Sequence, residues 1–166
     1  MLNRWRPWLL TALMICTMIG PATCAAQAQG ALPVPRFVSL RSDEVNVRAG
    51  PGVRYPVKWV FRRRYMPVEI IAEYDTWRKI RDWEGSEGWV HRAMLSSKRS
   101  LIVTADETTL RRDPTEEAPA VARLGAGIVA RVAECNANWC RVDLDDYDGW
   151  VRRDGFWGLY DGEELE

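Results

Sequence analysis

The feature that most constrains the fold of this 166-residue chain is a sequence pattern that occurs twice. The first copy contains Val45-Asn46-Val47-Arg48, Trp77 and Gly88-Trp89-Val90, and the second contains Thr108-Thr109-Leu110-Arg111, Trp139 and Gly149-Trp150-Val151. Equivalent residues are 63 positions apart at the arginines and 61 positions apart at the last tryptophans. Self-similarity at a steady period indicates two copies of one folding unit.

Each copy consists of short apolar stretches separated by turn residues, which is typical of β-strands. We expect strands at residues 45–48, 57–61, 68–74, 77–81 and 87–91, followed by a single helical turn at Met94-Leu95. In the second copy we expect strands at residues 108–111, 120–124, 128–134, 139–144 and 149–151. No stretch shows a sustained period of 3.6, so helix content should be low. Five short strands per copy predict an all-β fold of two small, strongly bent barrels.

The N-terminus has the order of charge, apolar run and small residues that defines a secretory signal peptide. Arg4 and Arg6 supply the charge, residues 8–19 are mostly apolar, and Ala26-Gln27-Ala28 ends the segment. The apolar run is shorter than the roughly 20 residues that span a bilayer. We therefore predict a signal peptide at 1–28 that leaves with Cys24, and a protein exported to the periplasm or cell envelope without a membrane anchor.

The remaining chain divides into an extended linker at 29–37, a first barrel at 38–98, a second barrel at 99–160 and an acidic tail at 161–166. Residues 99–103 are too few and too apolar for a loose tether, so we expect the barrels to touch.

Residues 37–98 carry 12 basic and 8 acidic residues, whereas residues 99–166 carry 8 basic and 15 acidic residues. This asymmetry suggests that the barrels attract each other or meet different partners. The balanced total argues against a nucleic-acid partner.

Cys135 and Cys140 are the only cysteines after the predicted signal peptide, and they flank Asn136-Ala137-Asn138. In an exported protein such a pair predicts a disulfide across a hairpin. A metal site would need more thiols or histidines nearby, and the single histidine, His91, lies in the other copy. We expect no metal site and no cofactor.

The first copy resembles the bacterial SH3-like domain family of exported envelope proteins. The resemblance lies in residues 45–52, Tyr55-Pro56-Val57, Trp77 and Gly88-Trp89-Val90-His91, and it runs from about residue 38 to 96. The second copy replaces Gly50-Pro51-Gly52 with Asp113-Pro114-Thr115 and adds the cysteine pair. The resemblance implies SH3-type barrels that bind cell wall, peptides or proteins, often beside a catalytic domain.

Recurrence at matched positions suggests a framework role for the duplicated tryptophans. We interpret Trp89 and Trp150 as core residues and leave Trp77 and Trp139 open between core and surface. The glycine before Trp89 and before Trp150 should let a neighbouring strand or ring approach closely. Gly50 and Gly52 should serve a tight turn that requires positive φ.

Tryptophans without a duplicate are better candidates for a binding surface, because tryptophan is enriched where proteins meet partners. We hypothesise an aromatic groove on the first barrel, to which an arginine run supplies charge. The groove residues are Tyr55, Trp59 and Trp83, with Arg62, Arg63 and Arg64. Two other interpretations of the arginines stay open: a solvated turn that blunts an edge strand, and a contact with the acidic second barrel.

No catalytic constellation is apparent, because the cysteines are expected to be paired and His91 has no nucleophile at a telling spacing. We predict a non-enzymatic binding module of the cell envelope, monomeric or weakly self-associating, whose partner is a cell-wall polymer or an envelope protein. An alternative is an accessory protein that docks on another envelope protein. A third is an accessory subunit of a cell-wall hydrolase.

Overall fold

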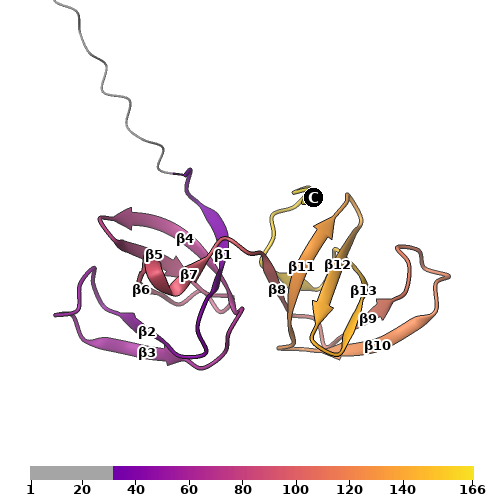
Figure 1. Cartoon of the computed structure of the whole chain (residues 1–166), viewed down its shortest axis with the longest axis horizontal. Coiled ribbons are helices and arrows are strands. Elements are labelled where there is room, and N and C mark those ends of the chain that lie inside the picture. Colours follow the sequence, from indigo (N-terminus) through magenta and orange to yellow (C-terminus); the bar gives the residue numbers. More distant parts are fainter. Residues whose placement is uncertain (1–31) are drawn as a thin grey trace, which may run out of the picture. The chain divides into compact units, whose positions relative to one another are not determined.

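Residues 32–166 are described by a computed structural model and consist of strands and turns (Figure 1). The predicted signal peptide and the start of the predicted linker lie outside these residues. The longest helical segment in the described part is η1 (Arg92–Met94), close to the expected helical turn. No helix in residues 32–166 is long and apolar enough to cross a membrane.

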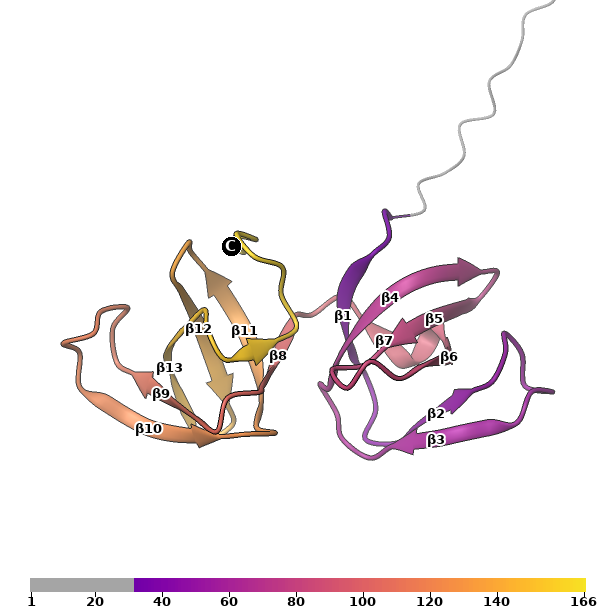
Figure 2. The same cartoon turned by 180° about the vertical axis from the view of Figure 1, so that it is seen from behind.

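The strands form two sheets of seven with the same topology. The first sheet has the order β3-β2-β6-β5-β4-β1-β7 and the second has the equivalent order β10-β9-β13-β12-β11-β8-β14 (Figure 2). The first contains β1 (Arg36–Leu40), β2 (Val45–Arg48), β3 (Val57–Phe61), β4 (Pro67–Tyr74), β5 (Trp77–Arg81), β6 (Glu87–His91) and β7 (Leu95–Ser96). The second contains β8 (Ser100–Val103), β9 (Glu107–Arg111), β10 (Ala120–Gly125), β11 (Val129–Cys135), β12 (Trp139–Leu144), β13 (Tyr147–Arg152) and β14 (Phe156–Trp157). The all-β expectation of two tandem barrels is confirmed.

The two sheets also share their irregularities. The pairing of β2 with β3 skips Lys58, and the pairing of β9 with β10 skips Val121, 63 positions later. A second register shift follows Ile70 in β4, and its equivalent follows Val132 in β11. Bulges increase local bending, which a small barrel needs in order to close. The repeat is therefore preserved in backbone geometry as well as in sequence.

Four strands were missing from the expectation: β1, β7, β8 and β14. All four residues of β8 are buried, as are four of the five in β1. A strand that is buried on both faces shows no alternation of apolar and polar residues, so periodicity does not reveal it. β1 begins inside the segment expected as a linker. β8 occupies the short connection between the copies, where it contacts β4 of the first barrel.

Each barrel has its own core, filled by the inward-facing residues of its strands. In β2, Val45 and Val47 are buried and Asn46 between them is exposed. The buried residues of the first core are Val38, Leu40, Val45, Val47, Val68, Ile70, Ile80, Val90 and Leu95. Those of the second are Leu101, Val103, Leu110, Leu124, Ala130, Cys135, Cys140, Val142 and Val151.

The expectation that Trp89 and Trp150 are core residues is wrong. Both are only half-buried, whereas Val90 and Val151 beside them are 0% and 1% exposed. Side chains alternate between the two faces of a strand, and valine takes the inner face in both copies. The tryptophans therefore lie on the outer face of each barrel.

The glycines before these tryptophans act as expected, by permitting close approach. A Cβ atom on Gly149 would lie 2.5 Å from the carbonyl oxygen of Arg111 in β9. A Cβ atom on Gly88 would collide with Val47 in β2. These two crossings close the barrels, since β6 pairs with β2 and β13 with β9.

The expectation of positive φ at Gly50 and Gly52 is wrong, because neither glycine adopts it. Gly50 is required for a different reason: a Cβ atom there would lie 2.5 Å from the ring of Tyr55. The ring of Tyr55 covers the glycine, and the loop between β2 and β3 folds back on itself.

An aromatic cluster joins the two barrels. Phe37 in β1 lies 4.7 Å, centroid to centroid, from both Trp157 and Tyr160 of the second copy. The hydroxyl of Tyr160 donates to Oε1 of Glu69 at 2.8 Å, and Arg81 donates to the other oxygen of that carboxylate. Burial, followed by the hydrogen bond to Glu69, raises the pKa of Tyr160 above its ordinary value.

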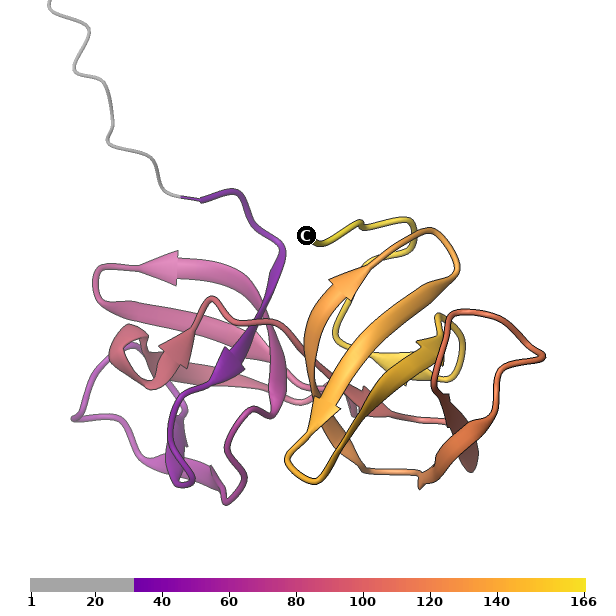
Figure 3. The ribbon, with the colours of Figure 1, turned by 45° about the vertical axis from the view of Figure 1, so that its right-hand side comes forward.

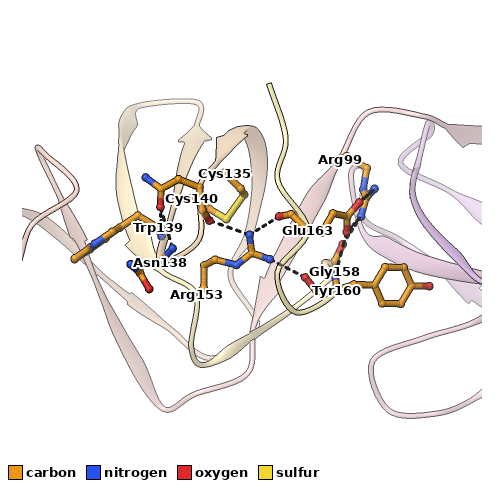
Figure 4. The surroundings of a disulfide bond; sticks show 10 residues. Arg99, Cys135, Asn138, Trp139, Cys140, Arg153, Gly158, Tyr160 and Glu163 are labelled. Carbon is orange, nitrogen blue, oxygen red and sulfur yellow. Dashed lines mark hydrogen bonds and ion pairs between the residues drawn. A yellow bond between two sulfur atoms is a disulfide. The ribbon is translucent and has the colours of Figure 1, made fainter.

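The C-terminal segment packs against the disulfide hairpin (Figure 4). The predicted bond between Cys135 and Cys140 is present. Leu165 pairs with Cys135 through two backbone hydrogen bonds, of 2.9 and 3.1 Å. Arg153 donates to carbonyl oxygens on both sides, at Asn136 in the hairpin and at Tyr160 in the tail. The hairpin and the tail therefore stabilise each other.

The ion pair between Glu163 and Arg99 ties the tail to the start of β8. Two hydrogen bonds join the side chains, at 2.6 and 2.9 Å. Burial raises the pKa of Glu163, but the hydrogen bonds from Arg99 and from the backbone N–H of Tyr160 outweigh burial and lower it below its ordinary value. The carboxylate thus stays ionised on the folded protein to lower pH than in the unfolded chain.

We expect the Cys135→Ser/Cys140→Ser variant to lose about 2 kcal/mol of unfolding free energy, because the bond closes a short loop in the unfolded chain. Urea unfolding of the variant and of the oxidised wild-type protein measures this difference. The reduced wild-type protein should match the variant. An unfolding midpoint that does not move on reduction would contradict a stabilising role for the bond.

Candidate functional site

Each barrel carries a surface groove of about 290 Å³ at the same position in the repeat. The first groove is lined by Glu44, Asn46, Arg48, Val53, Trp77, His91 and Met94. Their equivalents, Glu107, Thr109, Arg111, Glu116, Trp139, Arg152 and Gly155, all line the second groove. A protein usually has only a few hollows that are large enough to hold a ligand. Its recurrence at equivalent positions makes it the candidate functional site.

One wall of each groove is a loop held by the duplicated arginine. Arg48 donates to the carbonyl oxygens of Val53 at 3.1 Å and Tyr55 at 2.8 Å. Arg111 donates to the carbonyl oxygen of Ala118 at 2.9 Å, the position equivalent to Tyr55. The arginine therefore positions the loop and thereby shapes the groove.

The loop keeps its backbone hydrogen bonds even though its sequence differs between the copies. The N–H of Gly52 donates to Gly50 and that of Tyr55 donates to Gly52. In the second copy, the N–H of Thr115 donates to Asp113 and that of Ala118 donates to Thr115. Figure 1 shows the two loops as the connections from β2 to β3 and from β9 to β10. Asp113-Pro114-Thr115 thus supports the same turn as Gly50-Pro51-Gly52.

The floor of each groove is formed where the fifth and sixth strands pair. Trp77 pairs with His91 across β5 and β6, and their rings meet edge to face at 5.5 Å between centroids. Trp139 pairs with Arg152 across β12 and β13, and the guanidinium lies 5.9 Å from the centre of the indole. Trp77 is half-buried and Trp139 is buried. The sequence left both tryptophans open between core and surface. Trp77 is partly exposed at the floor of its groove, whereas Trp139 is buried beneath the floor of the other.

His91 has a second role at the end of the floor. Its Nδ1 accepts the backbone N–H of Ala93 at 3.3 Å and caps η1. In the neutral imidazole the other nitrogen, Nε2, then carries the proton, because the hydrogen bond of one nitrogen sets the tautomer. His91 therefore offers a hydrogen-bond donor beside the indole of Trp77.

The aromatic residues of the hypothesised groove do not share one surface with the arginines. Trp59 is half-buried and packs against the first core, and its Nε1 is buried without a hydrogen-bond partner. Tyr55 covers Gly50 before β3, and the arginines follow β3. A five-residue strand, ~17 Å long, separates them. Trp83 is 41% exposed in the turn between β5 and β6.

The arginine run lines a different cleft, of about 370 Å³, together with residues of the second barrel. Arg63 donates to the carbonyl oxygen of Gly127 at 2.7 Å, and Arg64 lies over the ring of Tyr65. Arg62 pairs with Glu44 at 3.6 Å. Neither Tyr55 nor Trp83 lines this cleft. Of the interpretations left open for the arginines, contact with the second barrel is the one that Arg63 makes.

The charge in this cleft is largely internally matched. Arg131 of β11 forms ion pairs of 2.7 Å with both Asp143 and Asp145 and lies over the ring of Tyr65. Hydrogen bonds to these two carboxylates raise the pKa of Arg131 above its ordinary value. The acidic residues therefore neutralise an arginine of their own barrel. Within residues 32–166, no group of three or more histidine, cysteine or acidic side chains could hold a metal ion.

The signal that would have identified the grooves was present in the sequence. Arg48 and Trp77 recur as Arg111 and Trp139, and both pairs line the grooves. Recurrence alone does not distinguish a framework residue from a functional one. In this fold the recurring residues also form the recurring surface.

The model of the bacterial SH3 domain matches residues 41–97 and 104–158. The chain belongs to the bacterial SH3 domain family. The two matches correspond to the two barrels and together cover more than half of the chain.

Among curated proteins, the chain is similar to the putative N-acetylmuramoyl-L-alanine amidase YrvJ of Bacillus subtilis (strain 168). The two are 27% identical over an aligned length of 125 residues, and the match covers 68% of this chain and 24% of the amidase. The chain thus spans about a quarter of the length of that relative.

Solved structures with similarity to the chain include NlpC1 and NlpC2 of Trichomonas vaginalis and an NlpC/P60 family protein of Bacillus cereus ATCC 10987. NlpC2 is 12% identical, with a TM-score of 0.35, and the match covers 78% of this chain and 50% of that protein. NlpC1 is 13% identical, with the same TM-score and 78% and 48% coverage. The Bacillus cereus protein is 11% identical, with a TM-score of 0.34 and 75% and 57% coverage.

Proposed function

We propose that this protein is a non-catalytic binding module of the cell envelope that recognises cell-wall material through a groove on an SH3-like barrel. Bacterial SH3 domains are cell-wall binding modules. The observation that carries the proposal is the pair of equivalent grooves, each with a tryptophan floor and an arginine-held loop. Similarity to a cell-wall amidase supports the substrate class. Export to the periplasm or envelope is part of the proposal, because cell-wall material lies there.

Sedimentation with purified cell-wall sacculi tests this function. We expect the wild-type protein to pellet with sacculi and the Asn46→Arg/Thr109→Arg variant to lose at least about tenfold in affinity, because each arginine inserts a long charged side chain into one groove. Such a loss is equivalent to 1.4 kcal/mol. A control variant, Tyr74→Arg/Ala133→Arg, adds the same charge at exposed positions outside both grooves. Absence of wild-type protein from the pellet would contradict the proposal.

An Arg63→Ala/Arg64→Ala variant separates the grooves from the arginine cleft and leaves Arg62, the partner of Glu44, in place. We expect it to bind sacculi like the wild-type protein, because Arg63 contacts the second barrel and Arg64 lies over Tyr65. Loss of binding in this variant would favour the arginines as the binding surface.

The second candidate function is docking on another envelope protein, alone or as the accessory subunit of a cell-wall hydrolase. The observation that favours it is the match to only a quarter of an amidase, which indicates a module that acts beside others. Periplasmic cross-linking followed by mass spectrometry distinguishes the two functions. A single dominant protein adduct from a protein that does not pellet with sacculi would support docking.

A further inference from the structure

The two grooves occupy equivalent positions but differ in how their charges are used. In the first groove the charged groups already have partners within the barrel. Arg48 is held by the loop carbonyls of Val53 and Tyr55, and Glu44 pairs with Arg62. Apart from Glu44 and Arg48, the lining residues carry no carboxylate or guanidinium group.

The rest of this lining combines apolar and hydrogen-bonding groups. Trp77 and Val53 supply apolar area, and Val53 at the loop tip is 78% exposed. Asn46 supplies an amide, which both donates and accepts hydrogen bonds. His91 supplies the Nε2–H donor, because its Nδ1 is engaged at Ala93. Apolar area with a few neutral hydrogen-bonding groups matches a peptide segment with uncharged side chains, whose backbone amides both donate and accept.

In the second groove, an ion-pair bridge spans the same space. Glu116 stands in the loop at the position of Val53, and its carboxylate pairs with Arg152 at 2.5 Å and with Arg111 at 3.4 Å. Arg152 stands at the position of His91 and lies over the indole of Trp139. We call the Glu116–Arg152 pair the strap. It connects the loop wall of the groove to its floor and covers the aromatic ring.

A ligand would have to break the strap to reach the second floor. Asp154 lies 3.8 Å from Arg152 and gives the guanidinium a second acidic neighbour. An uncharged peptide cannot replace either partner of an ion pair, so its binding would leave Glu116 and Arg152 without their contact. The indole below is also only 8% exposed.

Building on the proposed function, we propose that the first groove alone binds an uncharged peptide segment of the cell wall, and that the strap makes the second groove, which has the same volume, unreceptive to such a segment. Val53 and His91 leave the first groove receptive, whereas Glu116 and Arg152 form the strap in the second. The tandem repeat thus has one receptive barrel and one barrel whose groove is crossed by an ion pair.

A pair of single variants locates the binding groove. Asn46→Arg and Thr109→Arg introduce the same side chain at equivalent positions of β2 and β9. With sacculi as the probe, we expect Asn46→Arg to lose at least about tenfold in affinity and Thr109→Arg to remain within about twofold of wild type. Equal losses in both variants, or loss only in Thr109→Arg, would overturn the assignment while leaving the proposed function intact. A wild-type protein that does not bind sacculi would contradict the proposed function itself.

Exchanging the strap residues tests the role of the strap directly. The Val53→Glu/His91→Arg variant transfers the strap to the first barrel, and Glu116→Val/Arg152→His removes it from the second. We expect the first exchange to lower the affinity for sacculi at least about tenfold and the second to raise the apparent affinity, because two grooves of one molecule can then bind neighbouring peptides together. Near-wild-type unfolding midpoints verify that both variants fold. Unchanged affinity in a folded first exchange would overturn the role of the strap.

The chemistry of the ligand is tested with two further arms. The protein should bind intact sacculi and should not bind glycan strands stripped of their peptides. Equal binding to the stripped strands would overturn the peptide assignment. Recognition by uncharged groups should also resist salt, because salt screens only charge–charge attraction. We expect the affinity to change less than about twofold between 0.05 and 0.5 M sodium chloride. A steep fall with salt would overturn the uncharged ligand.

Discussion

Replacing Gly149 by alanine is expected to lower the free energy of unfolding by about 3 kcal/mol, at the upper end of the usual penalty for overpacking. The added methyl group would lie 2.5 Å from the carbonyl oxygen of Arg111 and 3.0 Å from Cγ of Leu110, which is fully buried. Backbone cannot move aside as a flexible side chain can. The crossing of β13 and β9 would therefore open, and with it the second barrel.

Thermal unfolding measures this effect, with an expected fall in midpoint of roughly 10 °C for a protein of this size. Gly125→Ala is the matched control, because a methyl group there has its nearest neighbour at 3.9 Å and the backbone φ is not positive. That variant should stay within about 1 kcal/mol of wild type. A Gly149→Ala protein as stable as the control would contradict the close approach of the two strands.

Replacing Phe37 by alanine is expected to cost about 4 kcal/mol, the usual range for a buried phenylalanine. The side chain is 6% exposed and packs against the rings of Trp157 and Tyr160 of the second copy. Its removal should do more than destabilise one barrel, because the cluster joins the two copies. We expect the wild-type protein to unfold in one transition and the variant to unfold in two.

Differential scanning calorimetry distinguishes the two forms of unfolding. Tyr74→Ala removes an aromatic side chain of the same barrel that is 62% exposed, and it should leave a single transition with a similar midpoint. A Phe37→Ala protein that still unfolds in one transition near the wild-type midpoint would show that the cluster does not couple the barrels.

The sequence predicted most strands because their surfaces alternate or are bounded by turns. β2, β3, β5, β6 and β12 have the predicted bounds, and the pairing of Cys135 with Cys140 was evident from their spacing. β1 and β8 were missed because they are buried on both faces; β1 also begins inside the segment expected as a linker, and β8 lies in the short connection between the copies. Their positions depend on contacts with distant strands, which periodicity along one segment does not report.

The candidate site was harder to predict because burial and recurrence do not separate framework from surface in this repeat. Trp89 recurs and lies on the outer face, whereas Trp59 has no duplicate and packs on the core. The neighbouring valine decides the first case, since Val90 occupies the inner face of β6. Trp59, in β3, packs over the first core. The absence of a duplicate in the second copy does not reveal this position. The grooves themselves require three strands and a loop to come together.

The three-dimensional arrangement also shows which partners some of the acidic residues of the second copy have. The second copy is acidic, but Asp143 and Asp145 pair with Arg131, and Glu116 pairs with Arg152 (Figure 3 shows the two copies from an intermediate angle). The link from the arginine run to the second barrel is the hydrogen bond from Arg63 to the carbonyl oxygen of Gly127. Several acidic residues of the second copy thus pair with arginines of the same barrel, so the number of acidic residues is a poor guide to an external ligand.

The most direct test of the account is to locate the ligand on the isotope-labelled protein by NMR. Soluble peptide-bearing fragments released from sacculi by glycan cleavage would be titrated into the ¹⁵N-labelled protein. The account predicts shifts at the indole N–H of Trp77 and at the backbone amides of Asn46, Val53 and His91, with those of Thr109, Glu116 and Arg152 unmoved. Shifts confined to Arg62, Arg63 and Arg64, or to the second groove, would contradict it.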